Sequence, residues 1–312
     1  MYAALFEPFI KKCGVVILDG AMATELEQRG ADLNHPLWSA RLLNENPILI
    51  KQVHLDYLQA GADIITTSSY QASFSGFEKQ GYSKEKAVEL LLLSTSIAIE
   101  AREEALKLNY INGPVPLIGA SIGPYGAFLA DGSEYRGNYG LGVEELMEFH
   151  RERIRTLSGT GADLMACETI PCPEEALAIM NVLNEFPSLK AWISFSCKNE
   201  SEVCDGSLFA ACVKLTNQSE QVVAVGINCT APQYVESLVN IAKASTEKNI
   251  LAYPNKGEVW DPGQKCWLPG AISIDFGQAA SNWYQAGATL IGGCCRSTPA
   301  DIKKLKTLFC SS

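Results

Sequence analysis

The chain has 312 residues, of which 47% are apolar, 9% aromatic and 19% charged, with 25 Gly and 14 Pro. This composition excludes collagen-like, coiled-coil and disordered chains and predicts a globular protein with a large buried core. The formal net charge is −10 and the basic residues are scattered. This charge pattern argues against a nucleic-acid-binding protein.

The amino-terminal sequence MYAALFEPFIKKCG does not combine a charged start with a clean apolar stretch, so we expect no signal peptide. The longest uncharged run, Leu108–Ala130, contains several prolines and glycines and fits a strand with flanking loops better than a membrane helix. In an untargeted chain, the eleven cysteines are expected to be reduced thiols or metal ligands. These features predict a cytoplasmic protein.

Short apolar runs rich in β-branched residues alternate with longer helical patterns along the whole chain. Several of the runs are almost continuously apolar, as expected for parallel strands that are covered on both faces. The predicted strands are Val15–Leu18, Ile64–Thr67, Leu117–Ala120, Leu164–Cys167, Trp192–Ser196, Val222–Asn228, Ile250–Tyr253 and Leu290–Ile291. Two of the helical patterns between them are Ser83–Leu108 and Val143–Leu157.

A short signature recurs where three of these helical patterns meet the next strand: Ala60–Asp63, Thr160–Asp163 and Ala286–Thr289. Each contains a glycine, the usual left-handed helix cap, directly before the strand. This repetition predicts eight β/α units in a single closed (β/α)8 barrel domain over residues 1–312. An open doubly wound sheet is the main alternative, but no G-x-G-x-x-G follows the first strand.

Three cysteines follow predicted strands, at the end of a barrel where catalytic groups lie. Cys229 ends the sixth strand, and Cys294 and Cys295 follow the eighth through two glycines. Three thiolates would suit Zn²⁺ and leave a fourth coordination position open, which is the catalytic rather than the structural pattern. Ordinary buried thiols are one alternative. A vicinal redox disulfide is another, but it would leave Cys229 without a role.

Histidine and serine offer no competing site. His35, His54 and His150 are the only histidines, and the last two fall in helical patterns, so we expect exposed or helix-packing side chains. The segment Gly119–Gly123 matches the nucleophile elbow of serine hydrolases. However, Pro124 follows it and no histidine lies beyond His150, so a tight turn or a backbone contact to a ligand is the better interpretation.

Two carboxylates also follow predicted strands. Asp19 precedes Gly20 and could be a simple turn or a helix cap. Glu168 is followed by Pro171 and Pro173, which delay the next helix and leave the carboxylate facing the barrel mouth. Both carboxylates could hold an amine or another cation.

Two turn-rich segments, Asp131–Gly137 and Tyr253–Glu258, could be turns without further function. The aromatic residues Tyr125, Tyr135 and Trp260 lie near them in the sequence and could instead face a cationic ligand.

These motifs resemble those of the homocysteine S-methyltransferase family. Leu18–Leu26 resembles the first-strand motif of the family, and Gly226–Cys229 and Gly292–Arg296 resemble its two zinc-ligand motifs. The resemblance extends from about Leu18 to the last predicted helix. Lys256 stands where many relatives carry a small residue.

Three further segments resemble the subgroup that uses S-methylmethionine or S-adenosylmethionine rather than betaine: Ser121–Gly126, Asp131–Gly137 and Pro254-Asn255. The resemblance therefore implies methyl transfer from a sulfonium donor to homocysteine, giving methionine, with S-methylmethionine as the better donor. Because related methyltransferases act on selenocysteine or selenohomocysteine, a selenol acceptor is an alternative. A zinc hydrolase or lyase and a non-catalytic metal-binding protein are more remote alternatives.

The resemblance also implies site residues. Cys229, Cys294 and Cys295 would hold Zn²⁺, with the homocysteine sulfur in the open position. The substrate-binding residues would be Glu168, which binds the homocysteine ammonium, with Asp19, Gly20, Ala21 and Asn228. The backbone N–H groups around Gly20 and Ala21 would receive the carboxylate at the start of a helix.

Overall fold

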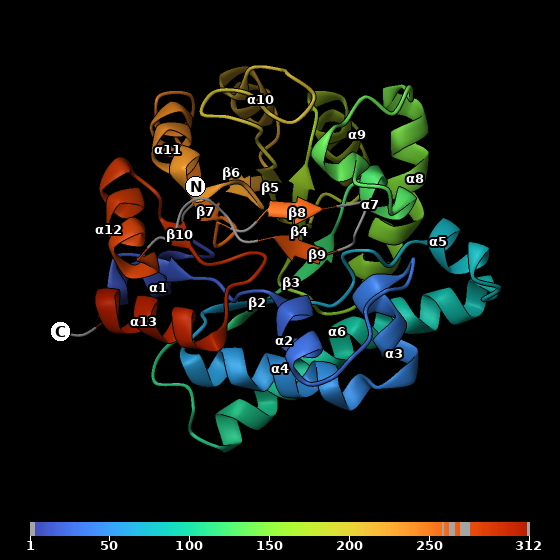
Figure 1. The fold of residues 1–312 in the computed structure, drawn as a ribbon, viewed down its shortest axis with the longest axis horizontal. Helices are drawn as coiled ribbons and strands as arrows, with labels where there is room; N and C mark the ends of the chain where they lie inside the picture. Colours follow the sequence, from blue (N-terminus) through green and yellow to red (C-terminus); the bar gives the residue numbers. More distant parts are fainter. Residues whose placement is uncertain (1–3, 258, 262–265, 269–274, 311–312) are drawn as a thin grey trace.

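The structure is a computed structural model that describes residues 4–257, 259–261, 266–268 and 275–310. In the segments 259–261 and 266–268 only the backbone is described. Eight parallel strands form one sheet in the order β1-β10-β7-β6-β5-β4-β3-β2. Leu18 forms a parallel bridge with Ile64, which joins the two outer strands and closes the barrel (Figure 1). The predicted (β/α)8 barrel is confirmed.

All eight predicted strands are present, with ends that shift by a few residues. The barrel strands are β1 (Val16–Ile17), β2 (Ile64–Thr66), β3 (Leu117–Ile122), β4 (Leu164–Ile170), β5 (Ala191–Phe195), β6 (Val222–Asn228), β7 (Asn249–Tyr253) and β10 (Leu290–Ile291). A separate antiparallel pair, β8 (Val259–Asp261) and β9 (Cys266–Leu268), follows β7.

Helices surround the barrel and connect its strands (Figure 1). The α-helices are α1 (Glu7–Cys13), α2 (Met22–Gln28), α3 (Leu42–Glu45), α4 (Pro47–Ala60), α5 (Phe74–Lys79), α6 (Lys84–Lys107), α7 (Tyr125–Leu129), α8 (Val143–Ser158), α9 (Pro173–Leu183), α10 (Phe209–Thr216), α11 (Val235–Lys243), α12 (Phe276–Ala286) and α13 (Pro299–Cys310). Short 3₁₀ turns are η1 (Trp38–Arg41), η2 (Ser133–Tyr135) and η3 (Pro232–Tyr234). Among the described residues, no helix is both long and apolar enough to cross a bilayer.

Apolar side chains fill both faces of the sheet, which explains the continuous apolar runs in the sequence. Leu164, Ala166 and Trp192 belong to the smaller of two buried clusters, and Met165 and Ile193 belong to the larger one. Successive residues of a strand point to opposite faces, so the small cluster fills the barrel and the large cluster lies beneath the helices. The rigid barrel fixes the strand ends that carry the candidate site.

The recurring helix-to-strand signature has a structural role at the amino ends of the strands. The Asp63 carboxylate accepts a hydrogen bond from Ile17 N at 2.9 Å, and the Asp163 carboxylate accepts one from Ile118 N at 2.8 Å. Thr289 Oγ1 accepts a longer one, 3.2 Å, from Ile250 N. Each side chain thus satisfies a backbone donor of the neighbouring strand, which would otherwise be buried without a partner.

The expectation that the cysteines are reduced is not met for four of them. Cys13, the last residue of α1, is joined by a disulfide to Cys310, the last residue of α13. Their Cα atoms lie 4.8 Å apart, within the range that disulfides span. The second disulfide joins Cys229 to Cys294 at the candidate site.

Candidate active site

The three predicted metal ligands lie together at the carboxyl ends of the strands. The sulfur atoms of Cys229, Cys294 and Cys295 all lie within 4.8 Å of one another, the only such group of His, Cys, Asp or Glu residues in the described ranges. Cys295 Sγ is 3.7 Å from Cys229 Sγ and 4.0 Å from Cys294 Sγ. Cys229 and Cys294 are joined by the disulfide, so this pair must be reduced before it can bind a metal as thiolates.

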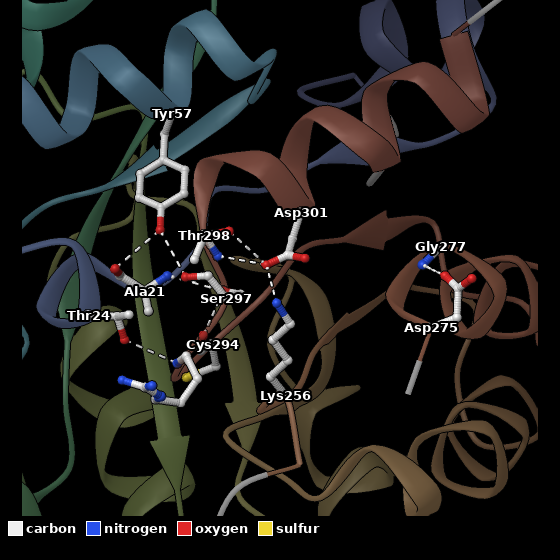
Figure 2. Close-up of polar contacts among 11 residues, drawn as sticks. Ala21, Thr24, Tyr57, Lys256, Asp275, Gly277, Cys294, Ser297, Thr298 and Asp301 are labelled. Atoms are coloured by element: carbon white, nitrogen blue, oxygen red, sulfur yellow. Dashed lines mark hydrogen bonds and ion pairs between the residues drawn. The ribbon is translucent and has the colours of Figure 1, made fainter. Parts of the chain in front are cut away.

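A hydrogen-bonded loop holds the vicinal cysteines in place. Cys294 N donates to Pro254 O at 2.8 Å. The Ser297 hydroxyl donates to Cys294 O at 2.6 Å (Figure 2). The hydroxyl of Tyr57, from α4, donates to Ser297 O at 3.3 Å. The loop after β10 is therefore attached both to the loop after β7 and to α4.

Lys256 fits this arrangement without entering the site. Its backbone N–H donates to Cys295 O at 3.2 Å, and its ammonium forms an ion pair with Asp301 at 2.9 Å (Figure 2). The Asp301 carboxylate also accepts hydrogen bonds from the backbone and the hydroxyl of Thr298. The side chain of Lys256 therefore points toward the first turn of α13.

Glu168 lies on β4 beside the cysteines and is 9% exposed. Its carboxylate accepts hydrogen bonds from the Ser121 hydroxyl and, at 3.2 Å, from the Tyr253 hydroxyl. Burial raises the pKa of Glu168 to about 7, against the effect of these hydrogen bonds. Ser121 is thus a hydrogen-bond partner of Glu168, which agrees with the interpretation that Gly119–Gly123 is not the nucleophile elbow of a serine hydrolase.

A local irregularity in β4 directs Glu168 toward the mouth. The pairing with β5 shifts register between Cys167 and Ile170, and Thr169 has a φ of +62°. A β-branched residue in this region is strained by about 1–3 kcal/mol. Two contacts to Asn228 hold the strained residue: Thr169 N donates to Asn228 Oδ1 at 2.7 Å, and Asn228 Nδ2 donates to Thr169 Oγ1 at 2.8 Å.

The side chain of Asn228 is therefore hydrogen-bonded to other residues of the protein. Its Oδ1 also accepts a hydrogen bond from Ser194 Oγ at 2.7 Å, and the side chain is 1% exposed. Ser194 Oγ in turn lies 2.5 Å from the Tyr253 hydroxyl. These contacts favour a positioning role for Asn228 behind Glu168, and the direct substrate contact of Asn228 stays a prediction.

Asp19, at the end of β1, is 6% exposed and accepts hydrogen bonds from Thr66 N at 2.7 Å and from Thr66 Oγ1 at 3.1 Å. Burial and, to a smaller extent, the charge of Glu168 raise the pKa of Asp19 to about 8, against the effect of the hydrogen bonds from Thr66. The two predicted carboxylates are therefore close enough to repel each other. A cationic group bound beside them would relieve that repulsion.

Gly20 and Ala21 connect Asp19 to α2. A Cβ at Gly20 would lie 2.7 Å from Ser297 Oγ and 2.9 Å from the Tyr57 ring, so only glycine fits there. Ala21 N donates to Ser297 Oγ at 3.2 Å (Figure 2). A substrate carboxylate would have to compete with Ser297 for this N–H group, and carboxylate binding at this position stays a prediction.

The expectation of helix-packing histidines holds for His54 and His150, which are both fully buried on helices. Arg153 donates to His150 Nδ1 at 2.9 Å, so the proton of this neutral ring is on Nε2, which donates to Glu175 at 2.8 Å. Arg153 also donates to Gly123 O at 2.6 Å. This buried network supports the loop after β3.

The three aromatic residues that could face a cationic ligand, Tyr125, Tyr135 and Trp260, do not share one environment. Tyr125 packs edge-on against Phe128, Tyr139 and Phe149, so it belongs to an aromatic cluster. Tyr135 is partly buried, and burial together with the charge of the Cys295 thiolate raises its pKa. Trp260 lies outside the residues whose side chains are described.

Sequence reasoning missed Tyr70, Tyr253 and Ser194. Tyr253 and Ser194 lie on predicted strands, at inward-facing positions near the carboxyl ends. The alternation of inward and outward side chains along these strands could have identified both residues from the sequence. Tyr70 lies in the loop after β2, where burial and the charges of Glu134, Glu168 and Cys295 raise its pKa. No pattern in the sequence singles it out.

Comparison with known proteins agrees with this geometry. The sequence pattern of the homocysteine S-methyltransferase family matches residues 16–309. The homocysteine S-methyltransferase YbgG of Bacillus subtilis is 52% identical over 93% of each chain. A selenocysteine Se-methyltransferase of Brassica oleracea is 47% identical over 96% of this chain and 92% of that chain.

A solved structure has the same fold. The metallated form of the homocysteine methyltransferase MmuM from Escherichia coli superposes with a TM-score of 0.88 at 41% identity, covering 98% of this chain and 99% of that chain. A metallated relative and a cluster of three cysteines both indicate that the site of this protein suits a metal. With a barrel of the same architecture and sequence matches over nearly its whole length, the chain belongs to the homocysteine S-methyltransferase family.

Proposed function

We propose that this homocysteine methyltransferase transfers a methyl group from a sulfonium donor to homocysteine, with Zn²⁺ bound by Cys229, Cys294 and Cys295. The observation that carries the proposal is the cluster of three cysteine sulfur atoms within 4.8 Å at the barrel mouth, beside the buried Glu168. The products are methionine and the thioether left by the donor.

The residues at the cluster fit zinc. Thiolates are soft ligands that Zn²⁺ prefers, and three protein ligands leave a position for a substrate sulfur. Bound zinc would lower the pKa of the homocysteine thiol, which is otherwise mostly protonated at pH 7. The Cys229–Cys294 disulfide must first be reduced to free these two ligands.

Glu168 and Asp19 bind the homocysteine ammonium in this proposal. Their pKa values of about 7 and 8 reflect burial without a cationic partner, so a bound ammonium would favour the ionised forms of both carboxylates. Ser121 and Tyr253 orient Glu168, and Asn228 holds the strained Thr169 that follows it. Gly20 and Ala21 lie beside Asp19, where they would face the amino-acid end of the substrate.

The methyl transfer itself needs little from the chain beyond orientation. The homocysteine thiolate forms the new carbon–sulfur bond with its lone pair, while the bond between the methyl carbon and the sulfonium sulfur breaks. The electron pair of the broken bond stays on the donor sulfur, so a sulfonium and a thiolate become two neutral thioethers. Because charge disappears in the transition state, a water-poor pocket favours the reaction. No side chain has to move a proton to or from carbon.

Donor choice follows from the same chemistry. We expect S-methylmethionine to be the better donor, S-adenosylmethionine to be used more slowly, and betaine to be inert, since a thioether leaves more readily than an amine. Side-by-side kcat/KM values at fixed homocysteine test this order in reduced, zinc-loaded protein. Betaine turnover comparable to that of S-methylmethionine would overturn it.

A selenol acceptor is the second candidate function, favoured by the 47% identity to a selenocysteine Se-methyltransferase. A selenol is more acidic than a thiol and would bind the same thiolate-rich site. Competition between homocysteine and selenocysteine for one labelled donor would identify the preferred acceptor.

A further inference from the structure

Glu134, in η2 after β3, has a carboxylate that the acceptor site does not use. Its Oε2 is buried and has no hydrogen-bond partner among the described residues. Burial and, to a smaller extent, the charge of Asp131 raise the pKa of Glu134 to about 7, and the charge of Arg136 acts in the opposite direction. A buried carboxylate oxygen without a partner is costly, which makes it a candidate for binding a ligand.

Glu134 lies on the same side of the mouth as Glu168. Ser196 Oγ donates to Glu134 O at 3.1 Å and lies 3.5 Å from Thr169 O, so the backbone of Glu134 is next to the residue that follows Glu168. The charge of Glu134 also raises the pKa of Tyr70 and of Tyr135. The carboxylate is therefore near two aromatic rings at the mouth, an environment suited to a cationic group.

Several contacts hold the Glu134 backbone in place. Ser196 Oγ, just after β5, donates to Glu134 O at 3.1 Å. Ser133 N donates to Asp131 Oδ1 at 2.9 Å, which closes a tight turn before Glu134. A Cβ at Gly126 would lie 2.3 Å from Glu134 N, so α7 packs directly on this backbone. The carboxylate is thus presented by a rigid loop.

We propose that Glu134 binds a cationic group of the methyl donor and so determines the specificity of the enzyme for cationic sulfonium donors. This inference rests on the proposed function, because it assigns Glu134 to the second substrate of the same reaction. Asp19 and Glu168 lie at the ends of β1 and β4 and serve the acceptor, whereas Glu134 lies in η2, on the connection between β3 and β4. Homocysteine and the methyl donor approach each other through their sulfur atoms, so their positively charged groups need separate partners in the protein.

The test is the steady-state kinetics of Glu134→Gln with S-methylmethionine and homocysteine, using zinc-loaded protein. The substitution keeps the side-chain size and removes the charge. We expect the KM for S-methylmethionine to rise about 10- to 100-fold, the range for losing a charged hydrogen bond. The KM for homocysteine and the zinc content should stay the same. Because the lost interaction stabilises the bound donor at least as much as the transition state, kcat should not fall.

Glu144→Gln is the matched control. It removes the same charge from an exposed residue on the first turn of α8, and its kinetics should be those of the unmodified enzyme. Equal increases in both KM values, or a fall in kcat at an unchanged donor KM, would overturn the assignment of Glu134. If the unmodified protein methylates homocysteine with none of the sulfonium donors, the proposed function fails instead.

Discussion

At the amino ends of the strands, Asp63 is paired with Lys306 and Asp163 with Arg102, and each also accepts a backbone N–H. At the carboxyl ends, the hydrogen-bond donors to Asp19 and Glu168 are hydroxyl groups and one backbone amide. One end of the barrel neutralises its buried acids with Lys306 and Arg102, whereas the groups that donate to Asp19 and Glu168 at the other end carry no positive charge.

Backbone strain follows the same division. Thr169, Cys229 and Arg296 all have positive φ values, from +45° to +71°, and each is a metal ligand or adjoins a site residue. At the amino ends, the positive φ values of Gly61, Gly287 and Asn109 occur in residue types that adopt them at no or little cost. Stability is thus concentrated at one end of the barrel, while strain and unpaired charge are concentrated at the other.

The largest effect should come from removing a thiolate at the mouth. In reduced protein, Cys295→Ser should lower the metal content from about one ion per chain to near zero and abolish methyl transfer, because two thiolates hold zinc poorly. Metal analysis and a methionine assay check both results. Cys310→Ser, which breaks only the disulfide between α1 and α13, should keep its metal. Full zinc content in the Cys295→Ser protein would remove the cluster from the mechanism.

A smaller effect is expected at Glu168. Glu168→Gln should weaken homocysteine binding by about 2–4 kcal/mol, since it leaves the substrate ammonium without its buried partner. Titration calorimetry on protein with verified zinc content measures this loss. Unchanged affinity would mean that the carboxylate at this end of the barrel is structural, like those at the other end.

The unpaired acids should also make stability depend on pH. The pKa of Asp19 is about 8 in the folded protein and near 3.8 when unfolded, so the unfolded chain releases this proton first as pH rises. The free energy of unfolding therefore falls between about pH 4 and pH 8. Asp19→Asn should reduce this fall in ligand-free protein, as measured by urea unfolding across the pH range. An identical pH profile for the variant would show that Asp19 is already neutralised by a partner.

The fold was predictable because strand periodicity and the glycine joints are local patterns, and all eight strands lie where these patterns place them. The three cysteines were found because they directly follow strands of a barrel. Tyr70 was missed because it lies in a loop, whose path no local pattern indicates. Glu134 lies in the segment Asp131–Gly137 that the sequence singled out, but its position in the site depends on non-local contacts such as the close approach of Gly126. The Cys13–Cys310 disulfide was missed because nothing local indicates that the two terminal helices meet.

The smallest predicted effect tests whether the amino end serves stability alone. Thr289→Val keeps the shape of the side chain and removes the hydroxyl that accepts the 3.2 Å hydrogen bond from Ile250 N. We expect a loss of about 1 kcal/mol in the free energy of unfolding, the usual net contribution of one such bond. The kcat/KM for methyl transfer should not change, because Thr289 lies at the opposite end of the strands from Cys229, Cys294 and Cys295. A fall in kcat/KM without a fall in stability would mean that the two ends are coupled through β7 and β10, and the division between them would have to be abandoned.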